Sequence, residues 1–161
     1  MKIIPATSDD WAVIRDLAHA IWPSTYQDVI PADQIDYMLH RGYSEDAIQQ
    51  QVEEGHRFYL VLQSQEPIGF FSWQPITTEQ AKLQKLYVLP ASQGKGTGTK
   101  LLEKVKELTR QEGYKQLILN VNRSNPAVGF YEKVGGKRLE EVDIPYGPYV
   151  LNDYVYGWEL T

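Results

Sequence analysis

The sequence contains no cysteine, and it has no apolar run approaching the roughly 18 residues that a membrane-spanning helix requires. The absence of cysteine excludes a disulfide framework, a thiolate metal site and a covalent intermediate on sulfur. The N-terminal segment Met1–Pro5 lacks the basic head and long apolar core of a secretory signal peptide. We therefore expect a cytoplasmic protein that has no membrane partner.

The chain also has fewer basic than acidic residues. Lysine and arginine together number 16 against 21 aspartates and glutamates, which gives a net charge of −5. A field of this sign disfavours nucleic acid as a partner, so any anionic ligand must be bound by local groups. His19, His40 and His56 lie far apart without the spacing of metal ligands, and no metal is expected.

Glycine and proline are too few and too scattered for a low-complexity chain, and 42% of the residues are hydrophobic against 23% charged. A chain of 161 residues buries enough surface for one core, and no repeat or linker interrupts it. We expect a single domain over residues 1–161, as a monomer or a homodimer.

Hydrophobic periodicity predicts an α/β fold with a mixed sheet covered by helices. Ser8 is expected to cap the first helix and Pro23 to stop it after Trp22. The expected helices are 11–22, Ala32–Leu39, Ser44–Glu54, 96–112 with a stop at Gly113, and Pro126–Val134 capped by Asn125. The expected strands are Lys2–Ala6, Arg57–Gln63, Ile68–Gln74, Ala81–Val88, Gln116–Val121, Lys137–Ile144 and Asn152–Leu160, with a four-residue turn at Ser64–Pro67 and a loop at Pro145–Pro148.

The segment from Leu86 to Lys100 joins a strand to an amphipathic helix through a turn rich in glycine. Unpaired amides at a helix N-terminus bind anions such as phosphate, and glycine lets the anion approach the backbone. The segment is not a Walker loop, because Gly96 follows Gly94-Lys95 where serine or threonine is needed. It is not a dinucleotide fingerprint either, because Thr99 stands where the last glycine belongs.

Gln93-Gly94-Lys95-Gly96-Thr97-Gly98 resembles the coenzyme A loop of the GCN5-related N-acetyltransferase (GNAT) family. Downstream, Asn125–Gly135 resembles the second signature of that family, in which an asparagine starts a short helix that carries Phe-Tyr and ends at glycine. The resemblance implies a mixed, mostly antiparallel sheet of six to seven strands, splayed at its centre, with helices on both faces. It also implies acetyl-CoA as the acetyl donor, an amine as the acceptor and no metal.

The resemblance further implies which residues serve each role. Acetyl-CoA is expected between the strand ending at Val88 and the strand Gln116–Val121, with its pyrophosphate on the loop amides and a Val88 N–H facing the thioester carbonyl. Tyr131 is the expected proton donor to the departing sulfur, with core packing as the alternative. The expected cofactor-binding residues are Leu86, Tyr87, Val88, Gln93, Gly94, Lys95, Gly96, Thr97, Gly98, Thr99, Asn120, Asn125, Tyr131 and Lys133.

Several of these assignments have a simpler alternative. Asn125 can cap its helix, bind the pantetheine arm, or do both. Lys95 and Lys133 either approach the adenosine phosphates or are solvated surface charges. Without a cysteine, direct attack by the amine is favoured over an acyl-enzyme. Glu79, Asp143 and Asp153 are candidates for the base that deprotonates the amine.

The resemblance places acceptor recognition in the early helices and the last strands. The expected substrate-binding residues are Trp22, Tyr26, Tyr37, Asp153 and Tyr154. Their segments resemble, more loosely, the PaiA-type polyamine acetyltransferase branch, and carboxylates with tyrosine faces suit a polycation. We therefore expect a small amine such as a polyamine. A protein N-terminus or lysine as the acceptor, or a coenzyme A sensor without turnover, are the alternatives.

Overall fold

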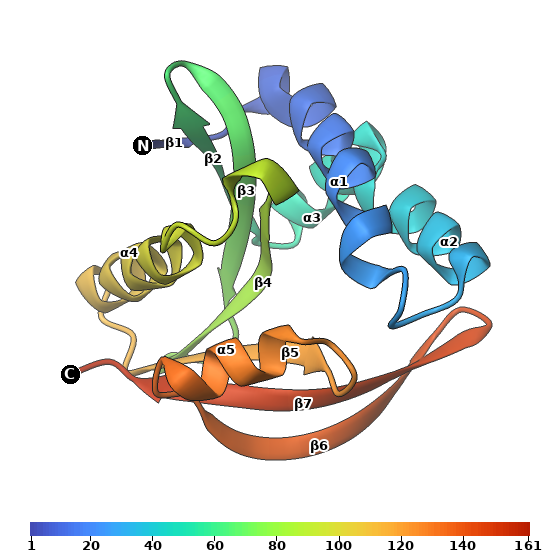
Figure 1. Cartoon of the computed structure of the whole chain (residues 1–161). Helices are drawn as coiled ribbons and strands as arrows, with labels where there is room; N and C mark the ends of the chain where they lie inside the picture. The colour runs from blue at the N-terminus through green and yellow to red at the C-terminus, as the bar shows by residue number, and fades with distance from the viewer.

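The computed structural model describes residues 1–161 and arranges them around a seven-stranded sheet (Figure 1). The elements are β1 (Lys2–Pro5), a 3-10 turn (Ser8–Asp10), α1 (Trp11–Tyr26), α2 (Ala32–Tyr43), α3 (Glu45–Glu53), β2 (Arg57–Gln63), β3 (Glu66–Pro75), β4 (Gln80–Val88), a second 3-10 turn (Pro90–Ser92), α4 (Thr97–Gln111), β5 (Gln116–Asn122), α5 (Ala127–Lys133), β6 (Lys137–Tyr146) and β7 (Tyr149–Glu159).

The strand order is β1-β2-β3-β4-β5-β7-β6, and β4 with β5 is the one parallel pair. Helices cover both faces of this sheet, with α1 to α3 on one side and α4 on the other (Figure 1). The predicted fold class is therefore confirmed. No helix is both long enough and apolar enough to cross a membrane.

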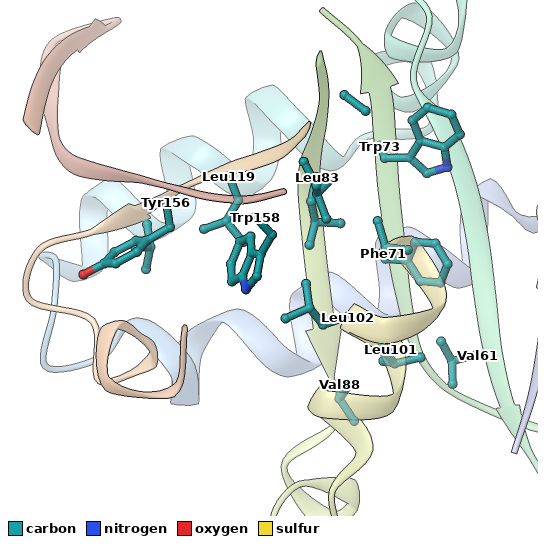
Figure 2. Packing of buried hydrophobic residues seen from close by; sticks show 14 of the residues in the cluster. Val61, Phe71, Trp73, Leu83, Val88, Leu101, Leu102, Leu119, Tyr156 and Trp158 are labelled. Atoms are coloured by element: carbon teal, nitrogen blue, oxygen red, sulfur yellow. The ribbon is translucent and has the colours of Figure 1, made fainter. Parts of the chain in front are cut away.

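Two hydrophobic cores stabilise the sheet, one on each face. Leu101, Leu102 and Val105 of α4 are fully buried against the strands, together with Phe71 and Leu83 (Figure 2). On the other face, α1 to α3 contribute residues such as Ile14, Ile21, Leu39 and Ile48 to a second cluster that includes Phe70 of β3. Burying one such side chain is worth about 1.5–3 kcal/mol, so α4 is firmly anchored beside the glycine-rich loop.

Helix α1 does not stop at Pro23, contrary to the sequence prediction, and continues to Tyr26. Proline removes one helical N–H, but here it lies in the last turn, where the hydroxyls of Ser24 and Thr25 both donate to the Ile21 carbonyl (3.1 and 3.0 Å). The predicted cap at Ser8 is also wrong, because the chain turns at Thr7, whose N–H donates to Asp10 Oδ2 (2.8 Å).

Helix α2 runs past the predicted end at Leu39 to Tyr43, even though Gly42 lies within it. Tyr43 is buried against Trp22 and Phe70, and this tertiary packing outweighs the low helix propensity of glycine.

Both predicted hairpin loops are too long. Gln63 pairs with Glu66, so Ser64 and Gln65 alone form the first turn, at φ of 50° and 68°. Positive φ at both positions gives the turn type that matches strand twist. In the second hairpin Tyr146 pairs with Tyr149, so the strands extend through the predicted loop and leave a two-residue turn.

Candidate functional site

Strands β4 and β5 separate in the middle of the sheet. They pair in parallel only from Gln80 with Gln116 to Leu83 with Leu119, and then diverge (Figure 1). Beyond this point β4 stays paired with β3 as far as Val88, and β5 stays paired with β7 as far as Asn122. We call the opening between 84–88 of β4 and 120–122 of β5 the splay.

The edge of β4 at the splay has unused backbone groups. Leu89 N–H donates to the Ile68 carbonyl (2.8 Å), and backbone groups alternate sides along a strand. The N–H and C=O groups of Leu86 and Val88 therefore point away from β3, toward the splay. The Val88 carbonyl accepts a hydrogen bond from Gln93 Nε2 (3.0 Å), which ties the glycine-rich loop to the strand end.

The glycine-rich loop presents a row of free donors. The backbone N–H groups of Gly94 through Thr99 donate to no acceptor within the protein. Gly94 and Gly96 have φ of 77° and 76°, and the space where a Cβ would lie is empty at both. Thr97 Oγ1 donates to the Ser92 carbonyl (3.1 Å) and holds the turn in place. The row of amides therefore lies open at the positive end of α4, which suits an anion.

The two lysines predicted near the phosphates differ in position. Lys95 lies exposed within the loop, whereas Lys133 is the exposed last residue of α5. Neither forms an ion pair.

Tyr131 of α5 packs its ring against Tyr156 and Trp158, with ring centroids 6.5 and 6.0 Å away. Its hydroxyl has no hydrogen-bond partner within the protein, and burial raises its pKa to about 12. The pKa values of Tyr26 and Tyr87, which are raised mainly by burial, are raised further by the nearby Tyr131 hydroxyl. Tyr131 thus brings a protonated, unpaired hydroxyl from the α5 side toward residues of the opposite face.

Asn125 lies just before α5, and its Oδ1 accepts the Ala127 N–H (2.9 Å). The carbonyl half of the side chain serves the helix start, while its amide half makes no hydrogen bond. Gly98 of α4 lies close to Phe130 of α5, because a Cβ on Gly98 would be only 3.4 Å from the Phe130 ring.

On the opposite face, the predicted residues Trp22, Tyr26 and Tyr87 come together. The hydroxyls of Tyr26 and Tyr87 are hydrogen-bonded (2.8 Å), and the Trp22 ring packs on both side chains. Trp22 is only 4% exposed, so it supports the two tyrosines and presents little surface of its own.

Asp153 and Asn120 lie on this same face, on β7 and β5. Asn120 Nδ2 donates to Asp153 Oδ2 (3.4 Å), and Lys82 of β4 is close enough to influence the carboxylate. Burial is the largest influence and raises the pKa of Asp153, while the hydrogen bond from Asn120 and the charges of Lys82 and Arg123 lower it. A carboxylate with a raised pKa is a better proton acceptor.

Tyr154 and Tyr37 lie apart from Asp153. Because side chains alternate along β7, Tyr154 points to the face of α5, where Arg138 stacks on its ring (3.8 Å). Tyr37 belongs to a contact between α2 and the tip of the β6–β7 hairpin, where it packs on Tyr146 and Tyr149, and Tyr149 donates to Asp33 Oδ2 (2.8 Å). We call this contact the clasp.

Two of the three candidate bases lie outside this group. Glu79 forms an ion pair with Lys115 at the paired end of β4. Asp143 is exposed on β6 and forms an ion pair with Arg123 (2.9 Å). Asp153 is the one candidate that the fold brings beside the splay.

Two lysines of β4, Lys82 and Lys85, were not predicted as site residues from the sequence. Between β3 and β4 the register passes from Trp73 with Leu83 to Ser72 with Lys85, so Gln84 is an extra residue that bulges from β4. The bulge shifts the alternation, and Lys82, Lys85 and Tyr87 all come to face α1 to α3. In the sequence, the bulge is visible only as a break in the alternation of apolar and polar residues at Leu83-Gln84-Lys85-Leu86.

A model of the acetyltransferase (GNAT) family matches residues 11–136 of this chain. The chain is 28% identical over 154 residues to the uncharacterized N-acetyltransferase YuaI of Bacillus subtilis, covering 90% of this chain and 87% of that one. It is 37% identical over 93 residues to the ribosomal protein bS18 alanine N-acetyltransferase of Haemophilus influenzae, covering 56% of this chain and 61% of that one.

Two solved structures have a similar fold. The PaiA N-acetyltransferase of Thermoplasma acidophilum, in complex with coenzyme A, matches with a TM-score of 0.81 at 23% identity over 99% of both chains. A GCN5-related N-acetyltransferase of Rhodopseudomonas palustris matches with a TM-score of 0.84 at 18% identity, over 99% of this chain and 95% of that one. At these identities the likeness shows the fold alone.

Proposed function

The chain belongs to the acetyltransferase (GNAT) family and is an N-acetyltransferase, and from this premise we propose that it transfers acetyl from acetyl-CoA directly to a small primary amine. The observation that carries the proposal is the row of free amides from Gly94 to Thr99 next to the unpaired edge of β4. A pyrophosphate fits the first of these features, and an extended chain of amides fits the second.

The residues present fit acetyl-CoA in two separate ways. The loop offers backbone donors and positive helix charge to the pyrophosphate, without side chains that would block it at Gly94 and Gly96. The N–H and C=O groups of Leu86 and the N–H of Val88 are free to pair with the pantetheine amides as a further strand would, while the Val88 carbonyl is held by Gln93. Asn120 and Lys133 contribute less to this site, since Asn120 is hydrogen-bonded to Asp153 and Lys133 is exposed.

Acetyl-CoA supplies an acetyl group activated as a thioester, and the products are an amide and a free thiol. Asp153 accepts the proton of the acceptor ammonium, for which its raised pKa suits it. The Val88 N–H stabilises an oxygen that gains negative charge during attack. Tyr131 keeps its proton at neutral pH and can give it to a leaving thiolate.

We call the side of the sheet that α1 to α3 cover, where Tyr26, Tyr87 and Asp153 lie, the acceptor face. A small acceptor is supported by the clasp, which connects α2 to the β6–β7 tip on this side. The polyamine expected from the sequence has weaker support from the charges. Asp153 is the one carboxylate at the splay, and Tyr154 faces the opposite side of the sheet, toward α5. The positive charges of Lys82 and Lys85 would repel a polycation. We therefore propose a small amine, and not specifically a polyamine, as the acceptor.

The test is an assay of purified protein with acetyl-CoA and a panel of amines that includes spermidine, cadaverine, lysine and an alanine-initiated peptide. Free thiol and the mass of the acetylated product are both measured. Acetylation of a low-molecular-weight amine supports the proposal, whereas acetylation of the peptide alone reassigns the acceptor to proteins. Binding of acetyl-CoA without thiol release for any amine would identify a sensor.

A further inference from the structure

Strand β4 carries a row of cations along the acceptor face. The bulge at Gln84 directs Lys82, Lys85 and Tyr87 toward α1 to α3. Tyr87 is hydrogen-bonded to Tyr26 beside the splay. Lys85 lies two residues before Tyr87, about 6–7 Å along the strand. The cations are therefore within the span of a small acceptor whose amine lies at the splay.

Lys85 has no anionic partner in the protein, whereas the charge of Asp153 acts on Lys82. Seven other cationic side chains form ion pairs, whereas neither of these two lysines does. Lys85 Nζ instead lies over the Tyr43 ring, 4.8 Å from its centroid. Burial lowers the pKa of both lysines, that of Lys85 to about 8. Lys85 therefore carries a largely uncompensated positive charge at neutral pH.

Other polar atoms next to Lys85 also lack partners. Ser72 is directly opposite Lys85 on β3, and its buried Oγ makes no hydrogen bond. The buried Nδ1 of His56 is likewise unpaired, and the charge of Lys85 helps to lower the pKa of His56 after burial. An unpaired cation is costly inside a protein, and a bound anion would compensate the charge of Lys85.

We propose that the acceptor amine also carries a carboxylate, which Lys85 and Lys82 bind while the amine lies at the splay beside Asp153. The acceptor is then a small zwitterion of the amino-acid type, not a polycation. This inference rests on the proposed function, and it specifies the substrate class of the same site.

The test compares L-lysine with cadaverine, which is the same diamine without the carboxylate. We expect kcat/KM to be at least tenfold higher for lysine. Lys85→Gln should reduce this preference to about twofold or less through KM, and Lys85→Arg should keep most of it. Lys137→Gln, at an exposed lysine of β6, is the matched control and should leave the preference intact. Titration with acetyl-CoA checks that each variant is folded.

Each contrary outcome has a distinct meaning. If cadaverine is acetylated as well as lysine, or if the preference survives Lys85→Gln, the carboxylate site is rejected and the acetyltransferase proposal stands. If acetyl-CoA binds but no amine of the panel is acetylated, both proposals fail.

Discussion

The hydroxyl of one buried tyrosine at the splay makes no hydrogen bond within the protein. This residue is Tyr131, and burial raises its pKa to about 12, so it remains protonated throughout the range in which the protein can be assayed. Tyr131→Phe should lower kcat by roughly 10²-fold, the scale for a lost general acid, and leave acetyl-CoA affinity nearly unchanged. Pre-steady-state and steady-state kinetics with a binding titration provide the measurement.

Tyr114→Phe is the control for this prediction, because Tyr114 packs on Trp73 away from the splay. It removes the same atom and should have little effect on kcat. Full activity in Tyr131→Phe would assign the residue to core packing, the alternative that its contacts with Tyr156 and Trp158 offer.

Individual residues were predictable from sequence where local chemistry fixes their role. Gly94 and Gly96 are at positive φ, as an anion-binding turn demands, and the Asn125 side chain accepts an N–H at the start of α5. Lys85 was not predictable, because its direction depends on a bulge whose position is set by pairing with Ser72 on another strand. The same limit applies to Tyr154, whose face follows from the register of β7.

At the scale of elements, helix α4 offers a matched pair of glycines at its two ends. Gly96 and Gly113 both have positive φ, and at neither does any atom lie within 4 Å of the place that a Cβ would occupy. Gly96→Asp should weaken acetyl-CoA binding tenfold or more, about 1.4 kcal/mol, because the carboxylate enters the anion site. Gly113→Asp should leave acetyl-CoA binding unchanged. Isothermal titration of both variants with acetyl-CoA measures the two dissociation constants.

The two substitutions carry a similar backbone penalty of about 1 kcal/mol, so their melting temperatures should fall by comparable amounts. An unchanged acetyl-CoA dissociation constant in folded Gly96→Asp protein would remove the loop from the binding site.

The clasp can be tested through Gly147 in the hairpin turn. A Cβ at this position would overlap the hydroxyl end of Tyr37, so Gly147→Ala should push the hairpin tip away from α2. We expect the acceptor KM to rise several-fold while acetyl-CoA affinity is retained. Gly113→Ala is the control, since Gly113 also has a positive φ (93°, against 57° at Gly147) but lies in open space. A rise in acetyl-CoA dissociation constant instead would mean that the clasp supports the whole fold.

Elements were predictable where their periodicity is strong, as in α4 and in β2 through β5. Their ends were less so, because α1 passes Pro23 and α2 passes Gly42 when buried aromatics such as Tyr43 stabilise the extra turns. The clasp could not be foreseen, since it joins residues more than 100 positions apart, such as Asp33 and Tyr149.

At the scale of the whole molecule, one half-buried histidine should make the free energy of unfolding fall at acidic pH. His56 has a pKa lowered to about 4, mainly by burial and then by the charge of Lys85. Because its unfolded pKa is near 6.5, the unfolded chain binds more protons between these values. The free energy of unfolding contributed by His56 should therefore fall as the pH drops from 6.5 to 4, by on the order of 1–2 kcal/mol.

Chemical denaturation of wild-type and His56→Gln protein between pH 5 and 7 measures this term, and the variant should show a weaker pH dependence. His19→Gln, at an exposed position of α1, is the control. Equal slopes for His56→Gln and the wild-type protein would contradict the expectation.

The splay has a consequence for how the molecule moves. Only four parallel pairs of residues join β1–β4 to β5–β7 through the sheet. The N–H groups of Leu86 and Val88, which lack a strand partner, should exchange with deuterium within seconds in the free protein, whereas amides of β3 remain protected. A ligand that occupies the splay supplies the missing strand, so its binding should slow exchange on both β4 and β5 and make the two halves unfold together.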